Sequence, residues 1–166
     1  MKHIHSLIFV FFITIQFCIG QESISEVLTL FNTESIPYIS VEELALEENK
    51  IIILDAREIR EYEVSHVKGA INVGYDNFDI SKILNTIKDK NKKIVVYCTL
   101  GVRSEDIAEK LKASGYTNVF NLFGGIFEWK NNDYNVFNSE EKQTENVHIC
   151  NEYWSKWLTK GKKVYE

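Results

Sequence analysis

The segment 94-IVVYCTLGVRS-104 sets the architecture of the chain. Its first four residues are β-formers without charge, and a run that short and apolar is typical of a buried strand. Apolar residues at 107, 108 and 111 follow helical spacing, and Gly115 stands where a helix C-cap belongs. We therefore predict that Cys98 ends a strand and that Ser104 begins a helix.

The loop between this strand and this helix has the features of a reactive cysteine site. A tight loop at this point directs backbone N–H groups and the positive end of the helix at the Cys98 sulfur. Such an environment favours the thiolate, which is the nucleophilic form of cysteine. Gly101 permits the positive φ that a sharp turn needs. The alternative is that Cys98 is a small buried hydrophobic residue, the usual role of a free cysteine.

Arg103 strengthens the case for an anion site. A cation in the first turn of a helix opposes the helix dipole at a cost of up to about 1 kcal/mol, whereas Glu105 and Asp106 are residues that this position favours. We interpret Arg103 as a group that binds an anion, with a simple ion pair to Glu105 or Asp106 as the alternative. The two carboxylates would disfavour a thiolate by like charge, and we expect them to face solvent.

The composition indicates a single globular domain. The chain has 166 residues, of which 45% are hydrophobic, and this is enough to build a core. No repeat or low-complexity tract occurs, and Pro37 is the only proline. The net charge of −5 argues against nucleic acid as a partner.

Residues 1–20 differ in kind from the rest of the chain. A weakly basic start precedes an almost wholly apolar run over 7–19, and the small residues Cys18 and Gly20 precede a predicted cleavage point. We interpret 1–20 as a secretory signal peptide, which implies an exported protein, periplasmic or extracellular, with no membrane attachment after cleavage. An uncleaved anchor and a lipid-modified Cys18 are the alternatives, but the run is shorter than the ~20 residues that a span needs.

The alternation of short apolar strands with helices predicts an α/β fold. We expect strands at 38–39, 51–54, 71–73, 94–97 and 119–120, and helices at 24–31, 41–46, 59–64, 80–87, 104–115 and 126–130. This pattern favours a central, mostly parallel sheet of about five strands with helices on both faces. Ligands bind beyond the carboxyl ends of the strands in such sheets, and Asp55, Cys98 and Asn121 would lie at that edge.

The regions outside the sheet are more difficult to interpret. We assign 21–37 to an N-terminal helical segment, 38–137 to the main domain, and 138–166 to a polar linker followed by a C-terminal amphipathic helix. The helix carries an apolar stripe that we interpret as core packing, with a partner-binding face as the alternative; the stripe consists of Tyr153, Trp154, Trp157 and Leu158. Cys150 we interpret as a buried or free thiol rather than the disulfide partner of Cys98.

Three blocks of residues, in order along the chain, resemble the sequence signatures of single-domain rhodaneses, which are sulfurtransferases. Leu54–Arg57, with Glu61, Tyr62 and 66-HVKGAIN-72, is similar to the first signature, and 98–104 is similar to the active-site loop. A third block resembles the second signature; it consists of Gly124, Gly125, Trp129, Tyr134 and Val136. The resemblance covers roughly residues 38–137, and it implies a rhodanese-like fold.

Three departures from the signatures concern turns more than chemistry. Ser65 stands where the family usually has glycine, and Asp133 and Asn135 replace a glycine and a proline. The departures therefore leave the implied activity mostly intact.

The resemblance implies a reaction and roles for the residues. Cys98 matches the cysteine that forms a persulfide: its thiolate takes the outer sulfur of a donor such as thiosulfate and passes it to a thiol or to cyanide. The rest of the loop would bind the donor, with Arg103 on its sulfonate; these residues are Thr99, Leu100, Gly101, Val102, Arg103 and Ser104. Asp55, Arg57 and His66 are expected to support the scaffold.

Neither a cofactor nor a metal is implied. The expected partners are a small sulfur donor, thiosulfate or a persulfide, and a thiol acceptor that can belong to a protein. One alternative is a non-turnover sulfur carrier or redox-responsive module that docks a partner through Trp154 and Trp157. A cysteine phosphatase of related fold is less well supported, because four residues separate Cys98 from Arg103, one fewer than in the similar phosphatase loop.

Overall fold

The computed structural model describes residues 22–47 and 50–165 of the chain. The predicted signal peptide lies outside these residues. Within them, no helix combines the length and the apolar character that a membrane span requires.

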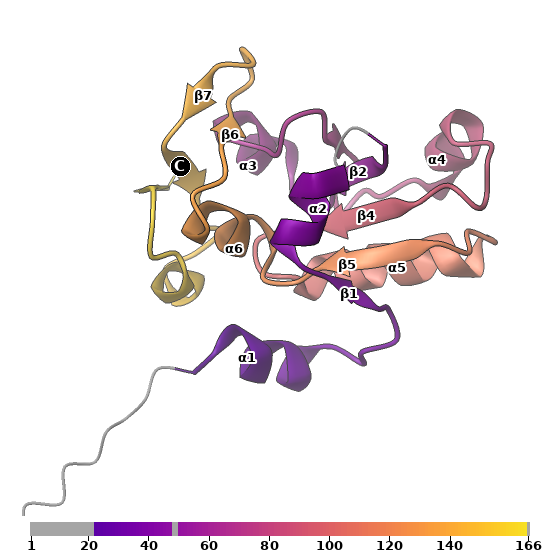
Figure 1. Ribbon diagram of the computed structural model, residues 1–166, viewed down its shortest axis with the longest axis horizontal. Helices are drawn as coiled ribbons and strands as arrows, with labels where there is room; N and C mark the ends of the chain where they lie inside the picture. The colour runs from indigo at the N-terminus through magenta and orange to yellow at the C-terminus, as the bar shows by residue number, and fades with distance from the viewer. Residues whose placement is uncertain (1–21, 48–49, 166) are drawn as a thin grey trace, which may run out of the picture.

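A five-stranded parallel sheet forms the centre of the molecule (Figure 1). Its spatial order is β1-β5-β4-β2-β3, and every neighbouring pair is parallel. The strands are β1 (Tyr38–Ile39), β2 (Ile52–Asp55), β3 (Ile71–Asn72), β4 (Ile94–Tyr97) and β5 (Val119–Leu122). The α/β class and the parallel sheet of five strands are confirmed.

Helices cover both faces of this sheet. α1 (Ile24–Phe31), α2 (Val41–Glu47) and α6 (Gly125–Asn131) contribute to one apolar core, while α4 (Ile80–Thr86) and α5 (Val102–Ala113) contribute to another. The remaining helix, α3 (Ile59–Val64), follows β2. β4 serves both cores because its side chains alternate, with Val95 and Tyr97 in the first and Ile94 and Val96 in the second.

The segment after α6 differs from the predicted linker. It forms β6 (Val136–Phe137), β7 (Gln143–Thr144), β8 (Asn146–His148) and β9 (Lys162–Val164), which pair as β6 with β7 and β8 with β9. Polar composition misled the prediction because Asn138 closes a tight turn. Its side-chain oxygen accepts hydrogen bonds from the backbone N–H groups of Glu140 and Lys142.

The predicted C-terminal amphipathic helix is a short 3₁₀ helix, η1 (Tyr153–Trp157). Trp157 and Leu158 are buried in the core, as the core-packing interpretation requires, whereas Tyr153 is exposed. The Asn131 side chain on α6 donates to the Trp157 carbonyl oxygen at 2.9 Å. The segment after α6 thereby returns to the domain and lies at one end of the molecule, beside α3 and α6 (Figure 1).

Candidate active site

The Cys98 loop joins β4 to α5 at the carboxyl edge of the sheet. Gly101 is the N-cap of α5 with φ +119°, so the helix begins at Val102, two residues before the predicted start at Ser104. This turn brings the Gly101 N–H to 3.1 Å from the Cys98 Sγ. The sulfur therefore receives a backbone hydrogen bond at the positive end of α5, which favours negative charge on it.

The N-terminus of α6 holds the carbonyl groups of the loop. The Ile126 N–H donates to the Cys98 carbonyl oxygen at 3.0 Å, and the Phe127 N–H donates to that of Thr99 at 3.2 Å. The approach is possible because Gly125 has no side chain: a Cβ there would lie 2.4 Å from the Cys98 oxygen. These carbonyl dipoles point to α6 rather than to the sulfur. The Gly124-Gly125 turn permits this arrangement because it lets the N-terminus of α6 approach the loop closely.

Asn121 on β5 fixes the far side of the loop. Its Nδ2 donates to the Gly101 carbonyl oxygen at 2.7 Å, and its Oδ1 accepts from the Ser104 hydroxyl at 2.7 Å. The Ser104 Oγ also lies 3.5 Å from the Cys98 Sγ. The register pairs Val96 with Asn121 and Asp55 with Tyr97, so the predicted meeting of Asp55, Cys98 and Asn121 at one edge is confirmed.

Arg103 is not the uncommitted cation that the sequence suggests. Its Nη1 and Nη2 donate to the two carboxylate oxygens of Glu61 at 2.7 and 2.8 Å, and Nη2 also donates to the Thr99 hydroxyl at 2.9 Å. The partner is therefore neither Glu105 nor Asp106. The pair forms because α3, which carries Glu61, lies against the loop in space although 42 residues separate the two in sequence.

The ion pair shifts the pKa values of both Glu61 and Arg103. Burial by itself raises the pKa of Glu61, but the hydrogen bonds and charge of Arg103 outweigh it and hold the pKa below its usual range. Burial also disfavours the charged form of Arg103, yet Glu61 raises the pKa of the guanidinium above its ordinary value. Both groups are charged at neutral pH, so the pair brings no net charge to the loop.

The expectation that Glu105 faces solvent is wrong. Its side chain is buried, and its Oε1 accepts hydrogen bonds from the backbone N–H groups of Thr33 and Ser35 at 3.1 Å each. The chain between α1 and β1 folds over the first turn of α5 and supplies these donors, a contact with no local signal in the sequence. Asp106 is exposed as expected, and it accepts a hydrogen bond from the Tyr75 hydroxyl.

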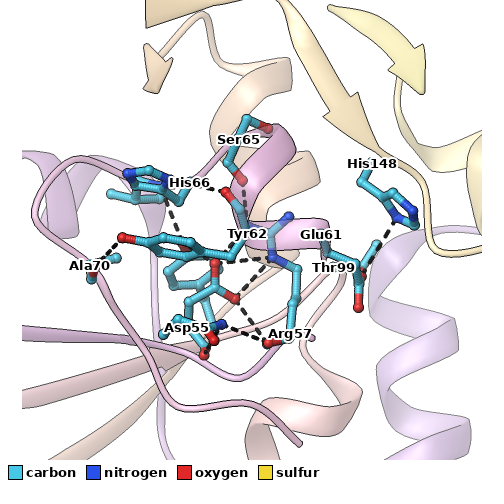
Figure 2. A network of polar contacts seen from close by, with 12 residues as sticks. Asp55, Arg57, Glu61, Tyr62, Ser65, His66, Ala70, Thr99 and His148 are labelled. Atoms are coloured by element: carbon cyan, nitrogen blue, oxygen red, sulfur yellow. Dashed lines mark hydrogen bonds and ion pairs between the residues drawn. The ribbon is translucent and has the colours of Figure 1, made fainter. Parts of the chain in front are cut away.

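Asp55 and Arg57 form a fully buried ion pair (Figure 2). Arg57 Nη2 donates to Asp55 Oδ2 at 2.6 Å and to the Ser65 carbonyl oxygen at 2.6 Å. The Tyr97 hydroxyl donates to the same Asp55 oxygen at 2.6 Å and accepts from the Val67 N–H at 3.1 Å. Burial and the Asp55 charge raise the pKa of Tyr97 well above its usual value, so the hydroxyl remains a donor.

His66 contacts framework residues through both its ring and its backbone. Its ring stacks on that of Tyr62 with centroids 3.9 Å apart, and Nδ1 lies 3.1 Å from the Tyr62 carbonyl oxygen. Its Nε2 lies 3.2 Å from a carboxylate oxygen of Glu141, and its backbone bridges to Phe137. Neither His66 nor the Asp55–Arg57 pair is among the described residues that line the Cys98 pocket.

A pocket of about 130 Å³ opens over Cys98. Its wall contains four of the predicted loop residues, Thr99, Leu100, Val102 and Arg103, while Gly101 and Ser104 contact the sulfur. Two further wall residues, Cys150 and Trp154, come from the C-terminal segment. Sequence reasoning missed their place in the site, as it missed Glu61, because no local pattern brings them to the loop.

Comparison with known proteins agrees with this geometry. The family model described as a rhodanese-like domain matches residues 40–132. A curated relative from Aster yellows witches'-broom phytoplasma, named tRNA uridine(34) hydroxylase, is 43% identical over 88 residues; the match covers 51% of this chain and 29% of that protein.

Solved structures of this fold superpose on the chain. A rhodanese-like domain protein from Staphylococcus aureus is 28% identical with a TM-score of 0.50, and the match covers 57% of this chain and 91% of that one. A thiosulfate sulfurtransferase from Pseudomonas aeruginosa is 22% identical with a TM-score of 0.57, covering 62% of this chain and 20% of that one, and this likeness concerns the fold alone.

Proposed function

The chain belongs to the family of rhodanese-like domains, and from this premise we propose that it is a sulfurtransferase whose Cys98 carries the transferred sulfur as a persulfide. The donor is a small sulfane-sulfur compound such as thiosulfate, and the acceptor is a thiol, or cyanide in an assay. The covalent intermediate divides one difficult transfer into two easier ones.

The reaction has two displacement steps. The Cys98 thiolate attacks the outer sulfur of thiosulfate, the sulfur–sulfur bond of the donor breaks, and sulfite leaves with the electron pair. The thiolate of an acceptor then attacks the outer sulfur of the persulfide, and Cys98 leaves as a thiolate. Cys98 is thus first a nucleophile and then a leaving group, and both roles require stabilised negative charge on its sulfur.

The observation that carries the proposal is the hydrogen bond from the Gly101 N–H to the Cys98 Sγ at 3.1 Å, at the N-terminus of α5. Because α6 holds the carbonyl groups of Cys98 and Thr99, the donor environment of the sulfur is built in advance. Preorganised donors of this kind stabilise charge without a reorganisation cost during the reaction.

We assign Arg103 to the donor's sulfonate, with Glu61 as the residue that fixes the guanidinium plane. The described contacts of Arg103 use three of its five N–H groups, and the side chain is 20% exposed and lines the pocket. The remaining N–H groups are available to an anion without loss of the pair with Glu61.

Sulfite and thiocyanate formation from thiosulfate and cyanide tests the proposal. We expect the wild-type protein to turn over and Cys98→Ser to lose the activity while retaining its circular dichroism spectrum. Activity in folded Cys98→Ser would contradict the proposal. Hydrolysis of a phosphate ester by the wild-type protein, without sulfur transfer, would favour the phosphatase alternative.

The sulfur-carrier alternative draws support from one feature of the site. Cys98 is only 2% exposed, at the base of a small pocket, so a bulky acceptor has poor access to it. A carrier loads one sulfur and releases it to a particular partner, whereas an enzyme turns over with small thiols. Multiple turnover with cysteine as acceptor would favour the enzyme, and a single stoichiometric release would favour the carrier.

The name of the relatives, tRNA uridine(34) hydroxylase, describes those longer proteins. The chain spans 29% of the length of the phytoplasma relative. The net charge of −5 gives no support for proposing RNA as a substrate of this chain.

A further inference from the structure

A second thiol lies in the wall of the Cys98 pocket. Cys150 belongs to the segment after β8, outside the residues that the family model matches. Its backbone has φ +63°, a left-handed conformation that few non-glycine residues adopt. The Cys150 N–H donates to the His148 Nδ1 at 3.0 Å, which holds this turn in place. The fold thus maintains an unfavourable backbone conformation at the residue that faces the reactive loop.

The two cysteines differ in what can reach them. Cys98 is buried, whereas Cys150 is exposed. Cys150 also lines a second pocket of about 370 Å³, whose other described wall residues are Arg60, His148, Ile149 and Tyr165. Cys150 is therefore common to the small pocket over Cys98 and to a larger one on the surface.

We propose that Cys150 takes the outer sulfur from the Cys98 persulfide and presents it in the second pocket to the thiol of a folded protein. This inference rests on the proposed function of Cys98 as the persulfide-forming residue. It gives the chain a substrate class, protein thiols, that the small Cys98 pocket does not admit.

The transfer is balanced without an added oxidant. The Cys150 thiol releases its proton to solvent, and its thiolate attacks the outer sulfur of the Cys98 persulfide. The bond from this sulfur to the Cys98 Sγ breaks, and the electron pair returns to Cys98 as the thiolate that accepts the Gly101 N–H. The outer sulfur keeps its oxidation state, and Cys150 now carries the persulfide.

The surroundings of the two sulfurs favour this direction. Partial desolvation of the Cys150 side chain in the pocket wall raises the pKa of its thiol, although Arg103 opposes the shift. The Gly101 N–H donates to the Cys98 Sγ, and this hydrogen bond stabilises Cys98 as the leaving group. Arg103 interacts electrostatically with both sulfurs, and Glu61 opposes its effect at Cys150.

His148 adds an independent indication that the second pocket receives a molecule. The residue is 3% exposed, and its Nε2 has no hydrogen-bond partner within residues 22–47 and 50–165. Because Nδ1 accepts from Cys150, a neutral ring carries its proton on Nε2. Burial lowers the pKa of His148 and keeps the ring neutral at neutral pH. A buried donor without a partner is destabilising, and an acceptor molecule in this pocket would satisfy it.

Mapping the added sulfur by peptide mass spectrometry tests the relay. Wild-type protein, Cys98→Ser and Cys150→Ser are treated with thiosulfate and their persulfides are alkylated. We expect sulfur on both cysteines of the wild type, on Cys98 alone in Cys150→Ser, and on neither position in Cys98→Ser. Direct loading of Cys150 in Cys98→Ser, or loading of Cys98 alone in the wild type, would overturn the relay. A wild type that takes no sulfur would instead refute the proposed function.

The choice of acceptor gives a second test. Cyanide is small enough for the Cys98 pocket, whereas reduced thioredoxin presents its thiols on a folded protein. We expect Cys150→Ser to lower the rate to thioredoxin at least ~10-fold more than the rate to cyanide, because only the former depends on the exposed thiol. Cys150→Ala is the matched variant that excludes an effect of the new hydroxyl. Equal losses with the two acceptors would contradict the proposal.

Discussion

Two ion pairs with buried carboxylates, Asp55–Arg57 and Glu61–Arg103, differ in what surrounds them. In the Asp55–Arg57 pair both side chains are fully buried, and every described contact belongs to the framework. In the Glu61–Arg103 pair, Glu61 is 2% exposed and Arg103 is 20% exposed, and Arg103 lines the Cys98 pocket. The same chemistry therefore supports the fold in one place and shapes a site in the other.

The difference lies in the second hydrogen-bond partner of each arginine. Arg57 donates to the Ser65 carbonyl oxygen, which ties β2 to the end of α3. Arg103 donates to the Thr99 hydroxyl, which ties α3 to the reactive loop. We therefore expect damage to the first pair to reduce stability, and damage to the second to reduce activity beyond its effect on stability.

The largest expected effect is that of Asp55→Asn. It leaves the fully buried Arg57 without a carboxylate, and removing one partner of a buried pair costs about 3–5 kcal/mol. Urea denaturation followed by circular dichroism measures the loss. We expect the molecules that remain folded to keep their sulfurtransferase rate. A loss under ~1 kcal/mol would show that the pair is not a main support of the fold.

Glu61→Gln is expected to have a smaller effect on stability and a larger effect on activity than Asp55→Asn. A glutamine keeps the shape but removes the charge that holds Arg103, which is partly exposed, so the stability loss should be about 1–3 kcal/mol. The sulfurtransferase rate per folded molecule should fall at least ~10-fold because Arg103 and Thr99 lose their anchor. A rate equal to that of Asp55→Asn would remove the distinction between the two pairs.

The pH dependence of stability sharpens the comparison. The pKa of Glu61 is lowered in the folded protein, because Arg103 outweighs the opposing effect of burial. The carboxylate therefore contributes stability that is present above its unfolded pKa of about 4.3 and is lost as the pH falls through the lower folded value. We expect the difference in unfolding free energy between wild type and Glu61→Gln to shrink over this acid range. A difference that is constant from neutral pH to well below pH ~4 would contradict this assignment.

The smallest expected effect is that of Glu47→Gln, which serves as the control. Glu47 pairs with Lys93 at 2.8 Å, but the two side chains are 44% and 25% exposed. Exposed pairs contribute little to stability because water screens them. A cost close to that of Asp55→Asn would mean that burial does not explain the contrast between the pairs.

The sequence was sufficient to predict the individual strands and the loop because both depend on local patterns. The apolar run 94–97 predicts β4, and Gly101 predicts the turn that places an N–H on the sulfur. It was insufficient for Glu61, whose partner lies 42 residues away, and for Cys150, which follows β8, a strand that lies against α3. Arg103 shows the limit most clearly, because its position predicts a cation at the loop but not the carboxylate that already binds it.

The intact mass of the protein after exposure to thiosulfate tests the central claim most directly. The account predicts that the wild-type chain gains the mass of at least one sulfur atom, that cyanide removes the added sulfur, and that Cys98→Ser gains none. A wild-type mass unchanged by thiosulfate, or an equal gain in Cys98→Ser, would contradict the claim that Cys98 carries the transferred sulfur.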